Sequence, residues 1–263
     1  MNKLNKKYIV LIKELALTDF KLKYQASVMG YLWSLAKPLM LFSVLYVVFT
    51  RFLKIGSNIE HYPVYLLLGV VIWGFFTEIT ASSLDAIVGK GELIRKIYFP
   101  RNVLLLSRSI TALLTFALNL LAVLAFILAT GVQLTPRAFL FPFVVLELFV
   151  LTVGIGFFLS ALFVRFRDIS HIWEIVLQAL FYATPILYPL SLVPTRYANL
   201  LLLSPVAQII QDARYLLITP QTITAWNTLV WKYVWIPYTV PFVVLGLGLL
   251  VFNKSAAKFA EEV

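Results

Sequence analysis

Long uninterrupted runs of apolar residues make up most of the chain beyond about residue 34. Runs of about 18 residues or more are long enough for an α-helix to cross the hydrocarbon core of a bilayer. Apolar positions in these runs are contiguous and do not alternate with polar ones, which disfavours membrane-spanning β-strands. The pattern predicts six membrane-spanning helices, at about residues 34–55, 62–84, 103–130, 139–164, 171–188 and 235–252.

Two segments have a different pattern. Residues 1–29 carry apolar side chains at helical spacing along one stripe with lysines opposite, which predicts a helix lying on the membrane surface. Asp19 falls close to that stripe, so a break near it is also expected. Residues 189–231 are apolar but interrupted by prolines and charges, and we expect two short helices there that dip partway into the outer leaflet. Such backbone must be covered by protein or face water.

The composition agrees with a single membrane domain over residues 1–263. Hydrophobic residues make up 61 % of the chain, charged residues 13 %, and the mean hydropathy is +0.91, whereas about a quarter of the residues in soluble proteins are charged. The predicted fold class is therefore an all-α integral membrane protein with six spans, a surface-lying N-terminal helix and short re-entrant outer helices before the last span.

The positive charges indicate how the chain is oriented. With the N-terminus inside, 16 of the 22 Lys and Arg residues fall on the inner side, which predicts that both termini are cytoplasmic. The net charge of +10 then faces anionic lipid or a cytoplasmic partner, and nucleic acid is not expected as a partner.

Residues typical of catalytic and metal sites are sparse. The chain has no cysteine, and its two histidines, His61 and His171, fall on opposite predicted sides of the membrane. Gly89-Lys90-Gly91 lacks the spacing of a phosphate-binding loop, because Leu84 stands where that loop needs a glycine. We therefore expect no metal site, no catalytic site and no ATPase activity of the P-loop kind.

Two charged stretches on the inner side have the character of docking surfaces. The loop 85–102 contains a predicted two-faced helix, with Leu93, Ile94 and Ile97 on one side and Glu92, Arg95 and Lys96 on the other. It could dock on a partner protein or lie as a surface helix. After the fourth span, Arg167 and Asp168 could cap the neighbouring helix ends, dock on a partner, or do both.

Three acidic residues fall within predicted spans: Glu78, Glu147 and Glu174. An acid inside a membrane is a functional candidate by default. The alternative is structural pairing with Arg or Lys, or hydrogen bonding between helices. Glu78 and Glu174 are expected in the inner half of the membrane, and the three acids are too scattered to form a proton relay.

Residues 21–38 mark the change from a basic N-terminus to a membrane protein. Lys21, Lys23 and Lys37 are placed to face lipid phosphates, and Tyr24, Tyr31 and Trp33 suit the headgroup layer. An ordinary membrane anchor is the alternative interpretation. Aromatic residues within or near the spans, Tyr46, Trp73 and Phe76 among them, could line a pore that binds a glycan or could pack against protein and lipid.

Five stretches together resemble the type-2 ATP-binding-cassette export permeases, most closely those that move O-antigen, capsule and teichoic-acid polymers. They are Lys21-x-Lys23-Tyr24-x-x-Ser27-x-x-Gly30-x-x-Trp33-x-x-x-x-Pro38, Gly69-x-x-x-Trp73-x-Phe75-Phe76, Leu93-Ile-Arg-Lys96-x-x-Phe99-Pro100, Arg167-Asp168-Ile169 and Pro185-Ile-x-Tyr188-Pro189-x-x-x-x-Pro194. The resemblance covers essentially the whole chain. Ser204-Pro205 departs from it, since the family often has Asn-Pro there.

The resemblance implies a homodimer in a bacterial cytoplasmic (inner) membrane, bound to two copies of a separate ATPase that holds the ATP and Mg. Residues 1–33 would form the cytoplasmic interface helix and the mouth of the channel, 34–188 the first five spans, 88–100 the coupling helix, 189–231 the outer gate helices and 235–252 the last span. The cargo would be a polyprenyl-diphosphate-linked polysaccharide such as O-antigen, or alternatively a teichoic acid, a drug or a lipid.

The resemblance assigns the first of two sets of residues, and the basic and aromatic residues themselves indicate the second. Coupling to the ATPase is expected of Glu92, Leu93, Ile94, Arg95, Lys96, Arg167 and Asp168. Contact with the substrate is expected of Lys21, Lys23, Tyr24, Tyr31, Trp33, Lys37, Tyr46, Trp73 and Phe76.

Overall fold

A computed structural model describes residues 3–25, 30, 32–55, 59–96, 99–256 and 259. At residues 3–6, 24, 93 and 95 it describes the backbone only. Tyr31 and Ile97, and the side chains of Tyr24, Leu93 and Arg95, therefore lie outside the described residues.

The described chain is helical and contains no strand within those ranges. Its elements are α1 (Lys3–Gln25), α2 (Leu32–Val47), the π-helical turn η1 (Val48–Phe52), α3 (Tyr62–Leu84), the 3₁₀ turn η3 (Val88–Lys90), α4 (Gly91–Lys96), α5 (Asn102–Ala129), η4 (Pro136–Leu140), α6 (Phe141–Arg165), α7 (Ile169–Ala183), η5 (Leu190–Leu192), α8 (Thr195–Leu202), α9 (Pro205–Leu217), α10 (Ala225–Thr228) and α11 (Trp231–Ala256).

Among the described residues, five helices are long and apolar enough to cross a membrane: Leu32–Phe52, Tyr62–Leu84, Asn102–Ala129, Pro136–Arg165 and Trp231–Ala256. They coincide with the first four predicted spans and the last one to within about four residues at either end.

The remaining predicted span, 171–188, is the one that differs. Its helix α7 has 15 residues and ends at Ala183, which is about 22 Å of helix. Thr184 is extended, with ψ of 140°, because the ring of Pro185 disfavours a helical conformation in the residue before it. Residues 184–188 therefore continue as non-helical chain.

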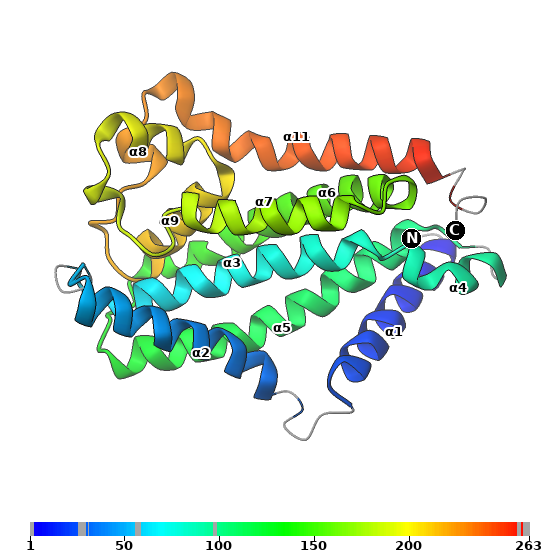
Figure 1. The fold of residues 1–263 in the computed structure, drawn as a ribbon, viewed down its shortest axis with the longest axis horizontal. Coiled ribbons are helices and arrows are strands. Elements are labelled where there is room, and N and C mark those ends of the chain that lie inside the picture. The colour runs from blue at the N-terminus through cyan, green and yellow to red at the C-terminus, as the bar shows by residue number, and fades with distance from the viewer. Residues whose placement is uncertain are drawn as a thin grey trace.

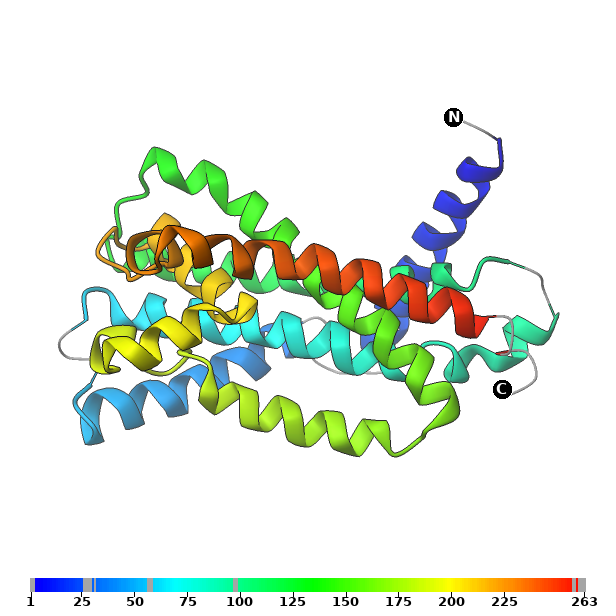
Figure 2. The same cartoon turned by 90° about the horizontal axis from the view of Figure 1, so that it is seen from above.

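The helices lie side by side in an elongated bundle with distinct ends (Figures 1 and 2). The start of α1, the short helix α4 and the C-terminal end of α11 lie at one end, and α8, α9 and α10 lie at the other. Helices α2, α5 and α7 run toward the end that holds α8 to α10, and α3, α6 and α11 run back.

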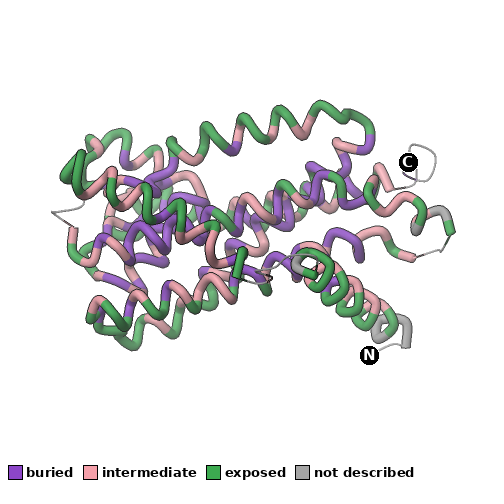
Figure 3. Tube along the Cα trace, turned by 60° about the horizontal axis from the view of Figure 1, so that its bottom comes forward, coloured by how far each residue is buried: buried purple, intermediate pink, exposed green. Residues whose placement is uncertain are grey.

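Helix α3 lies at the centre of this bundle. Of its most apolar stretch 78 % is buried, against 11–33 % for the other four long helices. It packs on α2, α5, α6, α7 and α9, and buried residues gather in the middle of the bundle while exposed ones cover its outside (Figure 3). A helix that is apolar on all sides is either a protein core or a lipid-facing span, and the contacts of α3 make it the core.

Helices α6 and α11 pack closely through glycine. A methyl group added at Gly154 would lie 2.6 Å from the Cα of Leu245, and one at Gly248 would collide with the carbonyl oxygen of Gly154. Small residues that bring two backbones together are the usual basis of helix association in membranes, where lipid is as apolar as the protein.

We expect Gly248→Val to destabilise the protein, because the added side chain must push apart two backbones. Overpacking costs about 1–3 kcal/mol in well-packed cores. The measurement is the midpoint of thermal unfolding of the purified chain in detergent. Gly246→Val, two residues away in the same helix with open space around it, is the matched control and should unfold near the wild-type midpoint. Equal midpoints for the two variants would contradict the close packing of α6 on α11.

Candidate functional site

A cavity of about 1030 Å³ lies among α2, α3, α5 and α7 and reaches the C-terminal part of α1. Its charged, polar and aromatic lining consists of Lys23, Trp33, Ser34, Lys37, Trp73, Thr77, Glu78, Thr115, Asn119, Gln178, Phe181 and Tyr182. Its apolar lining includes Met40, Leu41, Val70, Val71 and Leu177.

Two of the residues that line the cavity carry a buried oxygen atom without a hydrogen-bond partner in the described part of the chain. Thr77 Oγ1 and Asn119 Oδ1 are buried and have no hydrogen-bond partner among the described residues. Buried polar atoms are normally partnered by protein, water or ligand. Both atoms have almost no exposed surface, so water or a ligand in the cavity reaches them only after the side chains turn.

The structure brings four of the predicted substrate-contacting residues, Lys23, Trp33, Lys37 and Trp73, to this cavity. Lys21 is exposed on α1, outside the cavity lining.

Tyr46 and Phe76 are placed away from the cavity. Tyr46 stacks between Phe42 and Tyr62, with ring centroids 5.7 and 6.4 Å away. Phe76 is 2 % exposed and packs against Trp73 at 5.1 Å. Both positions are those of packing aromatics, which is the alternative that the sequence left open.

Glu78 forms an ion pair with Lys23. The Lys23 Nζ lies 2.5 Å from Glu78 Oε1, and both side chains are partly exposed, 39 % and 27 %. Lys23 lies in the last turn of α1 and Glu78 belongs to α3, so the pair joins α1 to the central helix beside the cavity. The acid within the third helix is thus paired with a lysine, as one of the two interpretations from sequence required.

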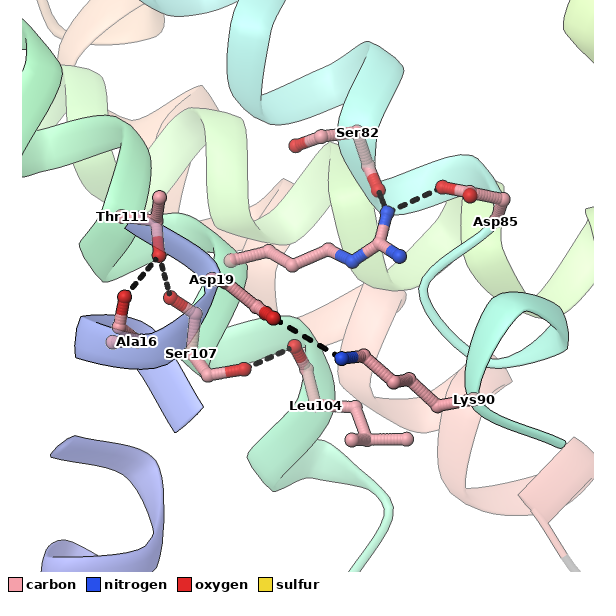
Figure 4. A network of polar contacts seen from close by, with 9 residues as sticks. Ala16, Asp19, Ser82, Asp85, Lys90, Leu104, Ser107 and Thr111 are labelled. Carbon is pink, nitrogen blue, oxygen red and sulfur yellow. Dashed lines mark hydrogen bonds and ion pairs between the residues drawn. The ribbon is translucent and has the colours of Figure 1, made fainter. Parts of the chain in front are cut away.

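Helix α1 is fastened to the bundle at two further points (Figure 4). Lys90 Nζ donates to Asp19 Oδ1 at 3.1 Å, and Thr111 Oγ1 donates to the carbonyl oxygen of Ala16 at 3.0 Å. The predicted break near Asp19 is wrong, since α1 is continuous over Lys3–Gln25. Lys90 in η3 neutralises the Asp19 carboxylate where the helix packs on the bundle. The helix therefore does not have to break to expose this charge to water.

The turn between α3 and α4 is held by Arg108 of α5. Its guanidinium donates to the carbonyl oxygen of Ser82 at 2.6 Å and pairs with Asp85. A side chain at Gly89 would lie against Asp85 and Arg108, at 3.3 and 3.4 Å. This packing fixes the position of the turn that leads into α4.

Helix α4 has the two faces that the sequence predicts, as far as its side chains are described. Glu92 and Lys96 point outward, 92 % and 75 % exposed, with 3.8 Å between their charged groups. Ile94 is half-buried and packs against the small core that includes Ile87 and Phe259.

Arg167 and Asp168 are exposed in the turn between α6 and α7. Asp168 occupies the N-cap of α7 without a side-chain hydrogen bond, and the guanidinium of Arg167 lies over the ring of Phe163 at 5.2 Å. The carboxylate is still favourably placed, because the N-terminus of a helix carries partial positive charge.

Sequence reasoning missed Arg214, the charged residue buried most deeply. It is fully buried in α9 and donates to the carbonyl oxygens of Tyr65 (3.2 Å), Pro185 (2.6 Å) and Ile186 (2.7 Å) and to Gln211 Oε1 (2.9 Å). It also lies 3.4 Å from the centre of the Tyr65 ring. Burial lowers the pKa of this guanidinium, but arginine stays protonated in proteins.

Arg214 supplies hydrogen-bond donors to the non-helical chain that follows α7. Residues 185–187 are not helical, so their carbonyl oxygens have no partner of the helical kind. Arg214 donates to two of these carbonyl oxygens, and Tyr62 Oη donates to the third, that of Leu187, at 3.0 Å. The sequence shows both the apolar segment around Pro185 and the charge at Arg214. Nothing in their spacing predicts that the two are in contact.

A second polar set joins α6, α9 and α11. Gln208 Nε2 donates to Asp212 Oδ2 at 2.7 Å and to Glu147 Oε2 at 3.4 Å, and Tyr238 Oη donates to Asp212 Oδ2 at 2.7 Å. Burial raises the pKa of Asp212, while the hydrogen bonds from Tyr238 and Gln208 act in the opposite direction. Glu147 is thus bonded between helices. Glu174 is exposed on α7.

We expect Arg214→Gln to destabilise the protein strongly. The shorter side chain leaves buried carbonyl oxygens of residues 65, 185 and 186 without donors, at about 1–3 kcal/mol for each group left unsatisfied. The midpoint of thermal unfolding in detergent measures the loss. The control is Arg196→Gln, an exposed arginine in α8, whose midpoint should stay within error of wild type. A wild-type midpoint for Arg214→Gln would show that the buried hydrogen bonds do not hold α9.

Residues 10–218 match the protein family described as ABC-2 type transporter. The chain is 29 % identical over 245 residues to the O-antigen export system permease protein RfbA of Klebsiella pneumoniae, covering 92 % of this chain and 91 % of that protein. It is 33 % identical over 197 residues to the protein of the same name from Myxococcus xanthus, 75 % of each chain. It is 24 % identical over 212 residues to the polysialic acid transport protein KpsM of Escherichia coli, 78 % of this chain and 80 % of that one. The chain belongs to the ABC-2 type transporter family.

Proposed function

We propose that this chain is the membrane subunit of an ATP-driven exporter that moves a polyprenyl-diphosphate-linked polysaccharide, such as O-antigen, out of the cytoplasm. The observation that carries the proposal is the cavity that Lys23, Lys37 and Trp33 line together. Cations suit a diphosphate, and the aromatic rings in the largely apolar lining suit the apolar faces of sugars. The RfbA relatives, named as O-antigen export system permease proteins, support the same substrate class.

The energy source would be a separate ATPase that docks on the end of the bundle holding α1 and α4. Glu92 and Lys96 are exposed there, and Ile94 packs inward, so displacement of α4 would move the turn that Arg108 and Lys90 hold. Coupling through Glu92, Leu93, Ile94, Arg95, Lys96, Arg167 and Asp168 remains our prediction, as do two ATPase copies and a homodimer with a channel between its subunits.

We also propose that α7 completes a set of six spans, with both termini cytoplasmic. The helix contributes about 22 Å, and residues 184–188 would cover the remaining depth as non-helical chain. Irregular backbone at membrane depth is tolerated only where protein or water satisfies its polar groups, and Arg214 and Tyr62 donate to the carbonyl oxygens of residues 185–187. On this topology α8 and α9 would be the re-entrant outer helices.

The proposal is tested with inverted membrane vesicles that contain this chain and the ATPase that co-purifies with it. We expect uptake of a labelled polyprenyl-diphosphate-linked glycan that requires ATP and both proteins. Glycan uptake by vesicles with this chain alone would refute the proposed dependence on a partner, and ATP-driven uptake of other lipids but not of the glycan would refute the substrate.

We expect Arg95→Glu combined with Lys96→Glu to abolish coupling without unfolding the chain. Reversed charges on a docking surface place like charges together and cost several kcal/mol of binding, which is tenfold or more in affinity. Glycan uptake and ATPase co-purification should fall by at least about tenfold. The control is Arg196→Glu with Lys232→Glu, two exposed basic residues near the opposite end, which should leave uptake unchanged. Normal uptake by the first variant would refute the coupling assignment.

A further inference from the structure

The ion pair between Lys23 and Glu78 lies beside the cavity. Both residues line the cavity, and both side chains are partly open to solvent, 39 % and 27 % exposed. An ion pair that water can reach contributes little to stability. It can therefore be exchanged for another partner without disturbing the fold.

Glu78 is the acid in an otherwise basic part of the cavity. Lys23, Lys37 and Trp33 surround the same space, and a carboxylate among them lowers the attraction of the empty cavity for anions. A phosphate group carries more charge and more acceptor oxygens than a carboxylate, and hydrogen bonds between ionised groups are the strong ones. Lys23 would therefore leave Glu78 for a phosphate, whereas a neutral glycan or lipid has no negative charge with which to replace the carboxylate.

We propose that Glu78 is a specificity-determining residue: it occupies Lys23 while the cavity is empty and releases it only to a diphosphate group on the substrate. The inference rests on the proposed function, because it concerns the same cavity. It adds that the group recognised at this edge is the diphosphate, and that recognition works by exchange of Lys23 between a carboxylate of the protein and the substrate.

The anchoring of α1 fits such an exchange. Asp19 and Lys23 are four residues apart, on the same face of the helix, and Asp19 is held by Lys90 at 3.1 Å. Thr111 holds Ala16 one turn earlier. The helix is thus fixed up to Asp19, and an exchange at Lys23 has to move only the final turn of α1.

Binding by the purified full-length chain in detergent tests the exchange, with farnesyl diphosphate, inorganic pyrophosphate and farnesol as probes. Glu78→Gln keeps the shape of the side chain and removes the competing charge, so both diphosphates should bind roughly two- to tenfold more tightly. Lys23→Gln removes the cation and leaves Glu78 facing the diphosphate, so binding should weaken by about tenfold or more. Farnesol, which has no phosphate, should bind equally to all variants.

The opposite signs of the two effects decide the question. A pair that merely braces α1 would be broken by either substitution, so both variants would then bind more weakly, and that result would overturn the proposal. Unchanged diphosphate binding in both variants would overturn it as well.

Glu174→Gln, at an exposed acid on α7, is the matched control and should bind as wild type. If Glu78→Gln does not fold, Glu78→Asp serves instead, and tighter binding is again expected because the shorter carboxylate holds Lys23 less closely.

The probes also separate two sources of the same chemistry. Equal affinity for pyrophosphate and farnesyl diphosphate supports recognition of the diphosphate alone, and a preference for farnesyl diphosphate supports recognition of a lipid-borne diphosphate. The assay needs no ATPase, so its failure is distinguishable from failure of the proposed export. Export of glycan and the ranking of diphosphate affinities among wild type, Glu78→Gln and Lys23→Gln are therefore independent results, and either can fail without the other.

Discussion

Main-chain polar groups need partners inside the protein wherever a membrane helix stops short, and this constraint shapes the end of the molecule that holds α8 to α10. Helix α7 ends at Ala183 because of Pro185, and the next carbonyl oxygens have no helical partner. The side chain of Arg214 reaches them from α9 and at the same time bonds the carbonyl oxygen of Tyr65 in the central helix. A single cation thereby fixes α9 against both α3 and the end of α7. Five N–H groups in one rigid plane make arginine suited to this task.

The lengths of the apolar runs were sufficient to predict where helices lie, because the thickness of a bilayer sets the length of a span. They could not predict which helix is central. Helices α5 and α6 are more apolar than α3, yet α3 is far more buried. Lipid is as apolar as a protein core, so hydropathy does not distinguish a lipid-facing side chain from a packed one. Phe76 illustrates the point. Its place in the sequence suited a residue that lines a pore, but the side chain is packed in the core.

The ionic contacts escaped prediction for a different reason. Asp19 and Lys90 are 71 residues apart, and Lys23 and Glu78 are 55 apart. Local pattern placed Glu78 inside a span, as the structure has it, but wrongly predicted a break near Asp19. In both cases the partner that makes the position tolerable lies on another element. Lys23, Trp33 and Lys37, in contrast, lie close together in the chain, and their convergence on one cavity could be expected from sequence.

The close contact of α6 with α11 has a consequence for how the chain is made. Gly154 and Gly248 meet backbone to backbone, yet more than 60 residues separate α6 from α11. A ribosome therefore releases α6 into the bilayer long before its partner exists, and until then lipid has to cover the groove at Gly154. The bundle can close only when the final helix has been inserted. A chain that ends before α11 would leave this face of α6 against lipid.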